Sequence, residues 1–439
     1  MKETGGCFKT HAKNASLKGK KLLLLGGTSA ASFDIVQYAK MNNVYTIVVD
    51  YNEFSPAKQL ADESWLISTA DVDKIIELAK KAGVDGVFAG ISEFNLERAM
   101  TVCEQLGLPF YAAREQWNLL SNKYSFKQLC RNNNIPVIEE YPINQFKSEG
   151  RNDIEFPVLI KPVDSSGGRG IHICANINEV FANYERSLAF SPSKQVLVER
   201  YMTGKEVAIF YVVQDGEICL TAMADRHTQH TQNGIIPLPV AYIFPSKHLK
   251  TYQESLNAKV TAMFKSIGIR NGMIFIQSFV ENGECIFYEM GFRLTGTLEY
   301  KILAKINGFN PMEMMVNYAL TGKMNETDIR RYVNPNFKKW GCNVTFLAKP
   351  GRIGKIIGVS EAASFPGVIE VVPTYKEGDL IAATALGTLK QVVMRVFAIA
   401  ITKKDLGSVM DMIHNTIKVI SENGENMLLP TFDTQELFE

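Results

Sequence analysis

The chain has 439 residues, of which 46% are hydrophobic and 21% charged, and this balance predicts a globular protein of about two to four domains. Its 47 Lys and Arg residues nearly match its 46 Asp and Glu residues, so the net charge of +1 gives no overall field that would attract nucleic acid or an anionic membrane. The longest apolar runs are far shorter than the ~20 residues of a membrane span. The seven cysteines are scattered without a CxxC pair, which favours a cytoplasmic protein over a disulfide framework.

The first part of the chain predicts a flexible tail followed by an α/β domain. Residues 1–17 are polar and show no periodicity. From Lys20 to Ala113 short apolar runs alternate with amphipathic helical segments, which predicts a Rossmann-like domain over residues 18–113. The first strand ends in GGTSAAS, a turn that could approach a pyrophosphate at a helix start. Because the third glycine of the dinucleotide fingerprint is missing, an ordinary strand-to-helix turn is favoured, with NAD binding as the alternative.

After a mainly helical segment over residues 114–141, the stretch VLIKPVDSSGGRG at residues 158–170 indicates a phosphate-binding loop. Lys161 ends an apolar strand, beside a loop that can offer backbone N–H groups to phosphate oxygens. The loop residues that we expect to do so are Ser165, Ser166, Gly167, Gly168 and Gly170. A solvent-exposed hairpin with an incidental lysine is the alternative. The chain has no GxxxxGK[ST] motif, which excludes a P-loop.

Two glutamates follow in the stretch VLVERYMTGKE. Glu199 stands at the end of a second strand, where a carboxylate and backbone groups can meet an adenine edge, and Glu206 lies where it could accept hydrogen bonds from ribose hydroxyls. Taken singly, each would be a solvated surface charge. The loop ADRHTQHTQNGIIPLP then carries His227 and His230, which could border a substrate pocket or be merely solvated.

The stretch FIQSFVENGECIFYEMGFR predicts a hairpin that could hold a metal ion. A two-residue turn at 282 and 283 would pair Gln277 with Tyr288, whereas a three-residue loop over 282–284 would place Gln277 opposite Glu289. An amide and a carboxylate oxygen, together with substrate phosphates, suit magnesium. Arg293 on the same strand would then lie near a transferring phosphate; the alternative is a surface hairpin with a salt-bridged arginine.

The tail from Gly341 predicts a small α+β domain over residues 341–439. Strands are expected at GRIGKIIGVS, VIEVVPTYK and VVMRVFAIAI. One helix is expected to carry Val409, Ile413, Ile417 and Ile420 on a single face.

Taken in order, these features resemble the ATP-grasp superfamily of ligases, and the resemblance covers nearly the whole chain. The matching positions are Lys123 in SNKYSFK, Lys161, Glu199, Glu206, Gln277, Glu289 and Arg293. The chain is similar to L-amino acid ligases, biotin carboxylase and the large subunit of carbamoyl phosphate synthetase. The resemblance implies a mixed α/β and α+β fold, with a pre-ATP-grasp domain over 18–113, an ATP-grasp domain over 114–340 whose lid covers about 142–202, and the C-terminal domain.

The resemblance also implies a role for each position. Lys123 and Lys161 would bind the α and β phosphates of ATP beneath a lid loop over 164–170, and Glu206 would bind ribose. Adenine would be held by Glu199 and by the backbone around Arg200 and Tyr201. Gln277 and Glu289 would hold Mg²⁺ or Mn²⁺, and Arg293 would act in catalysis by steadying an acyl phosphate.

Three positions depart from the family pattern. Gln277 stands where many relatives carry an acid, although carbamoyl phosphate synthetase also has glutamine there. Gly291 replaces an asparagine, which argues against a second tightly held metal. Thr297 replaces the acid that biotin carboxylase uses with bicarbonate, so carboxylation of biotin is not expected.

The function implied is that of an ATP-dependent carboxylate-amine ligase that forms an amide or peptide bond through an acyl phosphate. Two alternatives stay open: an enzyme that uses carboxyphosphate, like carbamoyl phosphate synthetase, and a nucleotide-binding protein without catalysis. The expected partners are a small-molecule carboxylate and an amine, with no nucleic acid and no membrane. A homodimer is expected by analogy with relatives.

Overall fold

The computed structural model describes residues 14–147, 154–165, 168–229 and 237–438. The chain divides into two units, one formed by Met1–Tyr111 with Met312–Glu326 and the other by Ala112–Pro311 with Thr327–Glu439. Of the tail predicted over 1–17, residues 1–13 lie outside the described residues, whereas Ala15–Leu17 form a short 3-10 helix with Leu17 fully buried. No helix in the described ranges has the length and apolar character that crossing a bilayer requires.

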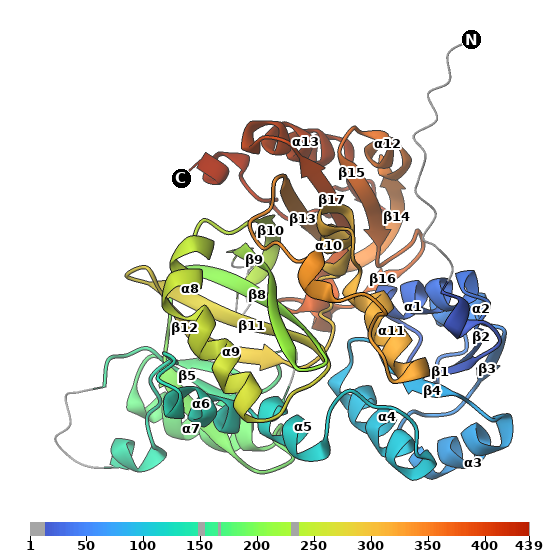
Figure 1. Ribbon diagram of the computed structural model, residues 1–439. Coiled ribbons are helices and arrows are strands. Elements are labelled where there is room, and N and C mark those ends of the chain that lie inside the picture. The colour runs from blue at the N-terminus through green and yellow to red at the C-terminus, as the bar shows by residue number, and fades with distance from the viewer. Residues whose placement is uncertain (1–13, 148–153, 166–167, 230–236, 439) are drawn as a thin grey trace. The chain divides into compact units, whose positions relative to one another are not determined.

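The first unit is built on a parallel four-stranded sheet with strand order β3-β2-β1-β4 (Figure 1). Its elements are β1 (Lys21–Leu25), α1 (Ala30–Met41), β2 (Tyr45–Val49), α2 (Pro56–Leu60), β3 (Glu63–Trp65), α3 (Val72–Ala82), β4 (Gly86–Phe88) and α4 (Glu93–Leu106). Leu22 to Leu25 of β1 are buried because this central strand is covered on both faces, as in other parallel sheets. Helix α11 (Pro311–Thr321) brings Ala319 against β4, where a Cβ on Gly86 would lie 2.1 Å from the Ala319 carbonyl oxygen.

The second unit contains an antiparallel eight-stranded sheet with strand order β12-β11-β8-β9-β10-β13-β17-β15. These strands are β8 (Lys205–Gln214), β9 (Glu217–Gln229), β10 (Leu238–Phe244), β11 (Gly272–Glu281), β12 (Glu284–Gly291), β13 (Trp340–Leu347), β15 (Val368–Pro373) and β17 (Val392–Ala400). The helices α5 (Arg114–Ser121), α6 (Lys123–Asn132), α8 (Leu249–Ser255), α9 (Asn257–Ser266) and α10 (Tyr300–Asn307) also belong to this unit. Since β13 pairs with β10, the boundary predicted at residue 340 does not coincide with a break between sheets.

A small antiparallel sheet with strand order β6-β5-β7 occupies the region that the sequence predicts as a lid. It consists of β5 (Val158–Pro162), β6 (His172–Cys174) and β7 (Val196–Arg200), with α7 (Ile177–Leu188) packed on it. Val158, Ile160, Val180 and Val198 form its apolar core, which also takes in Tyr141 and Phe146. This small core is the platform that carries Lys161 and Glu199.

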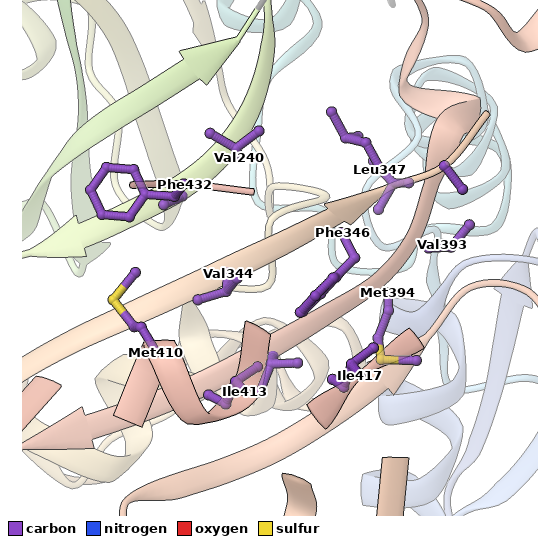
Figure 2. Packing of buried hydrophobic residues seen from close by; sticks show 14 of the residues in the cluster. Val240, Val344, Phe346, Leu347, Val393, Met394, Met410, Ile413, Ile417 and Phe432 are labelled. Atoms are coloured by element: carbon purple, nitrogen blue, oxygen red, sulfur yellow. The ribbon is translucent and has the colours of Figure 1, made fainter. Parts of the chain in front are cut away.

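The C-terminal part adds two α-helices and a second three-stranded sheet to the large sheet. The elements are β14 (Gly351–Ile357), α12 (Val359–Ser364), β16 (Leu380–Ile381), α13 (Lys403–Thr416) and β18 (Lys418–Ser421). Figure 2 shows its core, in which α13 brings Met410 and Ile413 against Val344 and Phe346 of β13. The predicted helix face was wrong at its end, because α13 stops at Thr416 and Ile420 belongs to β18.

Candidate active site

Most of the predicted site residues of the second unit gather around one cavity of about 380 Å³. Those that line it are Lys123, Lys161, Ser165, Gly168, Glu199, Arg200, Tyr201, Glu206, Gln277 and Glu289. They come from α6, from the three-stranded sheet β6-β5-β7 and the loops beside it, and from strands β8, β11 and β12, which are far apart in the sequence. Of the remaining predictions, Ser166, Gly167 and His230 lie outside the described residues. The cavity has the size of a small-molecule site.

Lys161 is buried beside Glu199, which it contacts at 2.9 Å between Nζ and Oε2. The other oxygen of Glu199 is paired with Lys127, whose Nζ also lies 3.3 Å from Oε1 of Glu140. Burial lowers the pKa of Lys161 to about 8, although the charge of Glu199 opposes this shift. Burial would raise the pKa of Glu199, but the two lysines lower it. Glu199 therefore serves here as a counter-ion, with both oxygens engaged by lysines.

Lys123 connects the loop after β5 to the large sheet. It is the first residue of α6, and its backbone N–H donates to the Val163 carbonyl at 3.0 Å. Its Nζ donates to the Ser165 carbonyl at 2.7 Å and lies 3.5 Å from Oε1 of Glu289. A ligand in the cavity would thus meet the ammonium group of Lys123, which lies between the loop after β5 and the carboxylate of Glu289.

Gln277 and Glu289 are direct partners across β11 and β12, as the metal hypothesis requires. The predicted three-residue loop was wrong. The hairpin closes on the two-residue turn Asn282–Gly283, both of which have positive φ, and Glu281 pairs with Glu284. A bulge then shifts the register past Tyr288, which restores the pairing of Gln277 with Glu289 and places Tyr288 and Glu289, although consecutive, on the same cavity.

The pair of oxygens on Gln277 and Glu289 fits a magnesium ion. Burial would raise the pKa of Glu289, but the charges of Lys123, Lys161 and Arg293 lower it, so the carboxylate is ionised at neutral pH. Within the described ranges no cluster of three or more His, Cys, Asp or Glu side chains gathers as a metal cage. Magnesium is commonly held by one or two protein oxygens together with substrate phosphates, which is what this geometry offers.

Arg293 lies beyond the end of β12 and is partly buried. Its guanidinium carbon is 4.9 Å from the centre of the Phe275 ring, and its Nη1 donates to the Leu294 carbonyl at 2.9 Å. Arg293 and Gly170 stand outside the cavity lining, although Gly168 and Arg169 belong to it. The charge of Arg293 is one of those that lower the pKa of Glu289.

Arg226 and Tyr288 are site residues that the sequence did not indicate. Arg226 pairs with Glu206, and the Tyr288 hydroxyl donates to Oε2 of the same carboxylate at 2.8 Å. All three line the cavity. A regular hairpin on the Asp215–Gly216 turn would have put Asp225 opposite Glu206, but a bulge between Phe210 and Tyr211 brings Arg226 there instead.

Lys127 was also missed, and for this residue a signal existed. It stands four residues after Lys123 in SNKYSFK, so both lysines share one face of α6. A buried lysine needs an anionic partner, and Glu199 is that partner.

His227 has different neighbours from those that a substrate role would need. Its Nδ1 is 3.2 Å from Oε2 of Glu436 and its ring packs on Phe432, while burial lowers its pKa despite Glu436. The lining of the cavity includes Arg226 and Thr228 but leaves out His227. The substrate role of His227 stays a prediction.

Comparison with known proteins finds relatives of most of the chain. Residues 122–327 match the family described as the carbamoyl-phosphate synthase L chain, ATP binding domain. The chain is 24% identical over 362 residues to a formate-dependent phosphoribosylglycinamide formyltransferase of Sulfurisphaera tokodaii, covering 80% of this chain and 86% of that protein.

Two solved structures have the same fold. One is the biotin carboxylase domain dimer of the 2-oxoglutarate carboxylase of Hydrogenobacter thermophilus, in complex with MgADP, ADP and bicarbonate; its TM-score is 0.74 at 19% identity, covering 92% of this chain and 91% of that chain. The other is an L-amino acid ligase of Bacillus licheniformis, with a TM-score of 0.73 at 16% identity, covering 92% and 99%. The fold predicted from the sequence is confirmed.

Proposed function

We propose, from the ATP-grasp domain that this chain contains, that the protein is a carboxylate-amine ligase that forms an amide or peptide bond through an acyl phosphate and releases ADP and phosphate. The observation that carries the proposal is the convergence of Lys123, Lys161, Gln277 and Glu289 on one cavity. ATP and Mg²⁺ are the cofactors of this domain.

Charge is the main obstacle to the first step, in which a carboxylate meets the γ-phosphate of ATP. Like charges about 4 Å apart repel by ~4 kcal/mol at an effective dielectric constant near 20. Lys123, Lys161 and Arg293 offset this repulsion with fixed positive charge, and Gln277 and Glu289 would hold the Mg²⁺ that neutralises the phosphates. The carboxylate oxygen then takes the γ-phosphoryl group, and ADP leaves.

The second step replaces phosphate by an amine. The amine nitrogen attacks the acyl carbon, the C–O bond to phosphate breaks, and the nitrogen gives up a proton. Arg293 would steady the negative charge on the tetrahedral adduct, and holding the reactants together could supply roughly 7 to 11 kcal/mol of the barrier reduction. The loop after β5 would exclude water from the site. Its described glycines Gly168 and Gly170 have positive φ, a backbone conformation that residues with a side chain rarely adopt.

Glu289→Ala tests the site assignment. The reaction is measured as phosphate released from ATP and Mg²⁺ across pairs of amino acids and other small acids and amines. The parent should release phosphate only with both a carboxylate and an amine, and Glu289→Ala should lower kcat by about 100-fold or more. Glu284→Ala is the matched control, because Glu284 lies on the same strand but is exposed beside the turn.

Parental turnover by Glu289→Ala would refute the assignment of the metal site. The match to the carbamoyl-phosphate synthase L chain gives a second candidate, an enzyme that uses carboxyphosphate. In that case phosphate release would depend on bicarbonate and not on an organic carboxylate.

Two further expectations belong to the proposal. A homodimer is proposed by analogy with the dimeric biotin carboxylase domain named above. A cytoplasmic location is proposed because the cysteines of the described residues are free thiols. The roles of Glu199, Arg200 and Tyr201 at adenine and of Glu206 at ribose remain proposals of the same kind.

A further inference from the structure

Gly291 occupies a position in β12 where the backbone does not require glycine. Its φ is outside the left-handed region that favours glycine, so an ordinary residue could adopt this conformation. Its partner across the sheet is Phe275 of β11, and along the ladder this pair is separated from the pair Gln277–Glu289 by one intervening pair, Ile276–Met290. Side chains at 289 and 291 would therefore point to the same face of the sheet.

The ring of Phe275 fills the place of a side chain at 291. A Cβ on Gly291 would lie 2.2 Å from Cε1, 2.5 Å from Cζ and 3.2 Å from Cδ1 of Phe275. Phe275 is only 7% exposed, so its ring has little room to withdraw. The glycine is thus explained by the aromatic ring that covers it, a known form of cross-strand pairing.

The Phe275 ring also contacts the guanidinium group of Arg293. The guanidinium carbon is 4.9 Å from the ring centre, within the range of a cation–π contact. Gly291 is two residues before Arg293. Because position 291 has no side chain, the Phe275 ring can fill that space and contact this arginine.

We propose that Phe275 is a positioning residue for Arg293 and that its ring fills the space in which a side chain at 291 could add a ligand beside Glu289, so that the protein holds one tight divalent ion through Gln277 and Glu289. This inference rests on the proposed function for the role of Arg293. The packing and the number of metal ions do not depend on it.

A thermal double-mutant cycle tests the packing. Gly291→Ala should lower Tm in the parent because its Cβ meets Cε1 and Cζ of the ring. In a Phe275→Leu background, which lacks those two atoms, the same change should cost clearly less. Equal losses in both backgrounds would overturn the inference.

The number of bound metal ions tests whether the Phe275 ring excludes a further metal ligand at position 291. Mn²⁺ titrated into the protein with ADP and followed by electron paramagnetic resonance should show one tightly bound ion per chain. Two tight ions in the parent would contradict the proposal. This count, like the thermal cycle, can be made whether or not a substrate has been found.

Kinetics test the support of Arg293. Phe275→Leu should lower kcat about tenfold and leave KM for ATP within about twofold, because the arginine acts on the reacting group and not on nucleotide binding. Phe264→Leu is the matched control, since it removes a fully buried ring of α9 and should lower Tm without the loss in kcat.

The outcomes separate the two proposals. An unchanged kcat in Phe275→Leu would overturn the positioning role while leaving the ligase activity intact. A parent that turns over no carboxylate and amine pair would overturn the proposed function, and the thermal cycle and the metal count would then decide on Phe275 alone.

Discussion

The turns after β1 and after β5 both contain glycines, but they differ in what surrounds those glycines. In the turn after β1, the Gly27 N–H donates to Oδ2 of Asp50 at 2.7 Å. A Cβ on Gly26 would lie 2.4 Å from Nδ2 of Asn95, and one on Gly27 would lie 2.4 Å from Oγ of Ser55. The protein's own side chains occupy the space, and a carboxylate already takes the N–H that a pyrophosphate would need.

The turn after β5 has the opposite character. Gly168 lines the cavity, and the Ser165 carbonyl accepts a hydrogen bond from Lys123, which leaves that lysine at the edge of the same cavity. Lys161 lies at the base of the turn with its charge directed at Glu199. The two turns therefore differ in that the turn after β5, where we propose that phosphate binds, combines a glycine on a cavity with two lysines that line the same cavity.

The largest expected difference between the two turns concerns their buried lysines. Lys161→Met should raise KM for ATP about 10- to 150-fold, the value of a hydrogen bond to a charged group. Lys58→Met is the matched change at the other turn, where Nζ donates to the Asp50 carbonyl at 2.6 Å, and it should leave this KM within about twofold. Steady-state kinetics across ATP concentrations measure both KM values. Equal increases in the two variants would contradict a specific role of Lys161 in ATP binding.

Gly27→Ala should affect stability and not nucleotide binding. The new Cβ would lie 2.4 Å from Oγ of Ser55 and 3.0 Å from Cγ1 of Val48, so overpacking should cost about 1–3 kcal/mol in the free energy of unfolding. Urea denaturation gives this loss, and Ser55→Ala in the same chain should recover part of it. A tenfold loss of ADP affinity at parental stability would instead reveal a second phosphate site.

The smallest expected effect is one of pH. Since the pKa of Lys161 is about 8, the free enzyme carries this charge below pH 8 and loses it as pH rises. The kcat/KM for ATP should therefore be level below pH 8 and fall by up to about tenfold per pH unit above it. In Lys161→Met this fall should vanish; a fall that persists would assign it to another group.

The order of the chain's motifs predicted several of the residues that line the cavity, because most of the charged positions stand near an end of an apolar strand or on a short amphipathic helix. The details of the sheet were not predictable, since strand pairing depends on bulges that leave no signal in composition. Residues 282–284 were expected to form the loop, yet a two-residue turn and one bulged residue give the same net register. Two differences cancelled, and Gln277 still met Glu289.

The same limit hid the partner of Glu206. Counting back from the turn at Asp215–Gly216 places Asp225 opposite this glutamate, and only the bulge near Tyr211 brings Arg226 into position. The pairing of β13 with β10 was not predictable for a related reason. It is a contact between distant segments, and local patterns contain no information about it.

The bulge at Tyr288 means that this residue can be removed without changing the pairing of Gln277 with Glu289. Deleting residue 288 would remove the bulge and restore a regular ladder from the turn at Asn282–Gly283. The glutamate would then follow Phe287 directly and would still pair with Gln277. Only the phenol that contacts Glu206 would be lost from the cavity. Loss of this single residue would therefore reshape the part of the cavity around Glu206, where we propose that ribose binds, and would keep Gln277 and Glu289, the proposed metal ligands, paired.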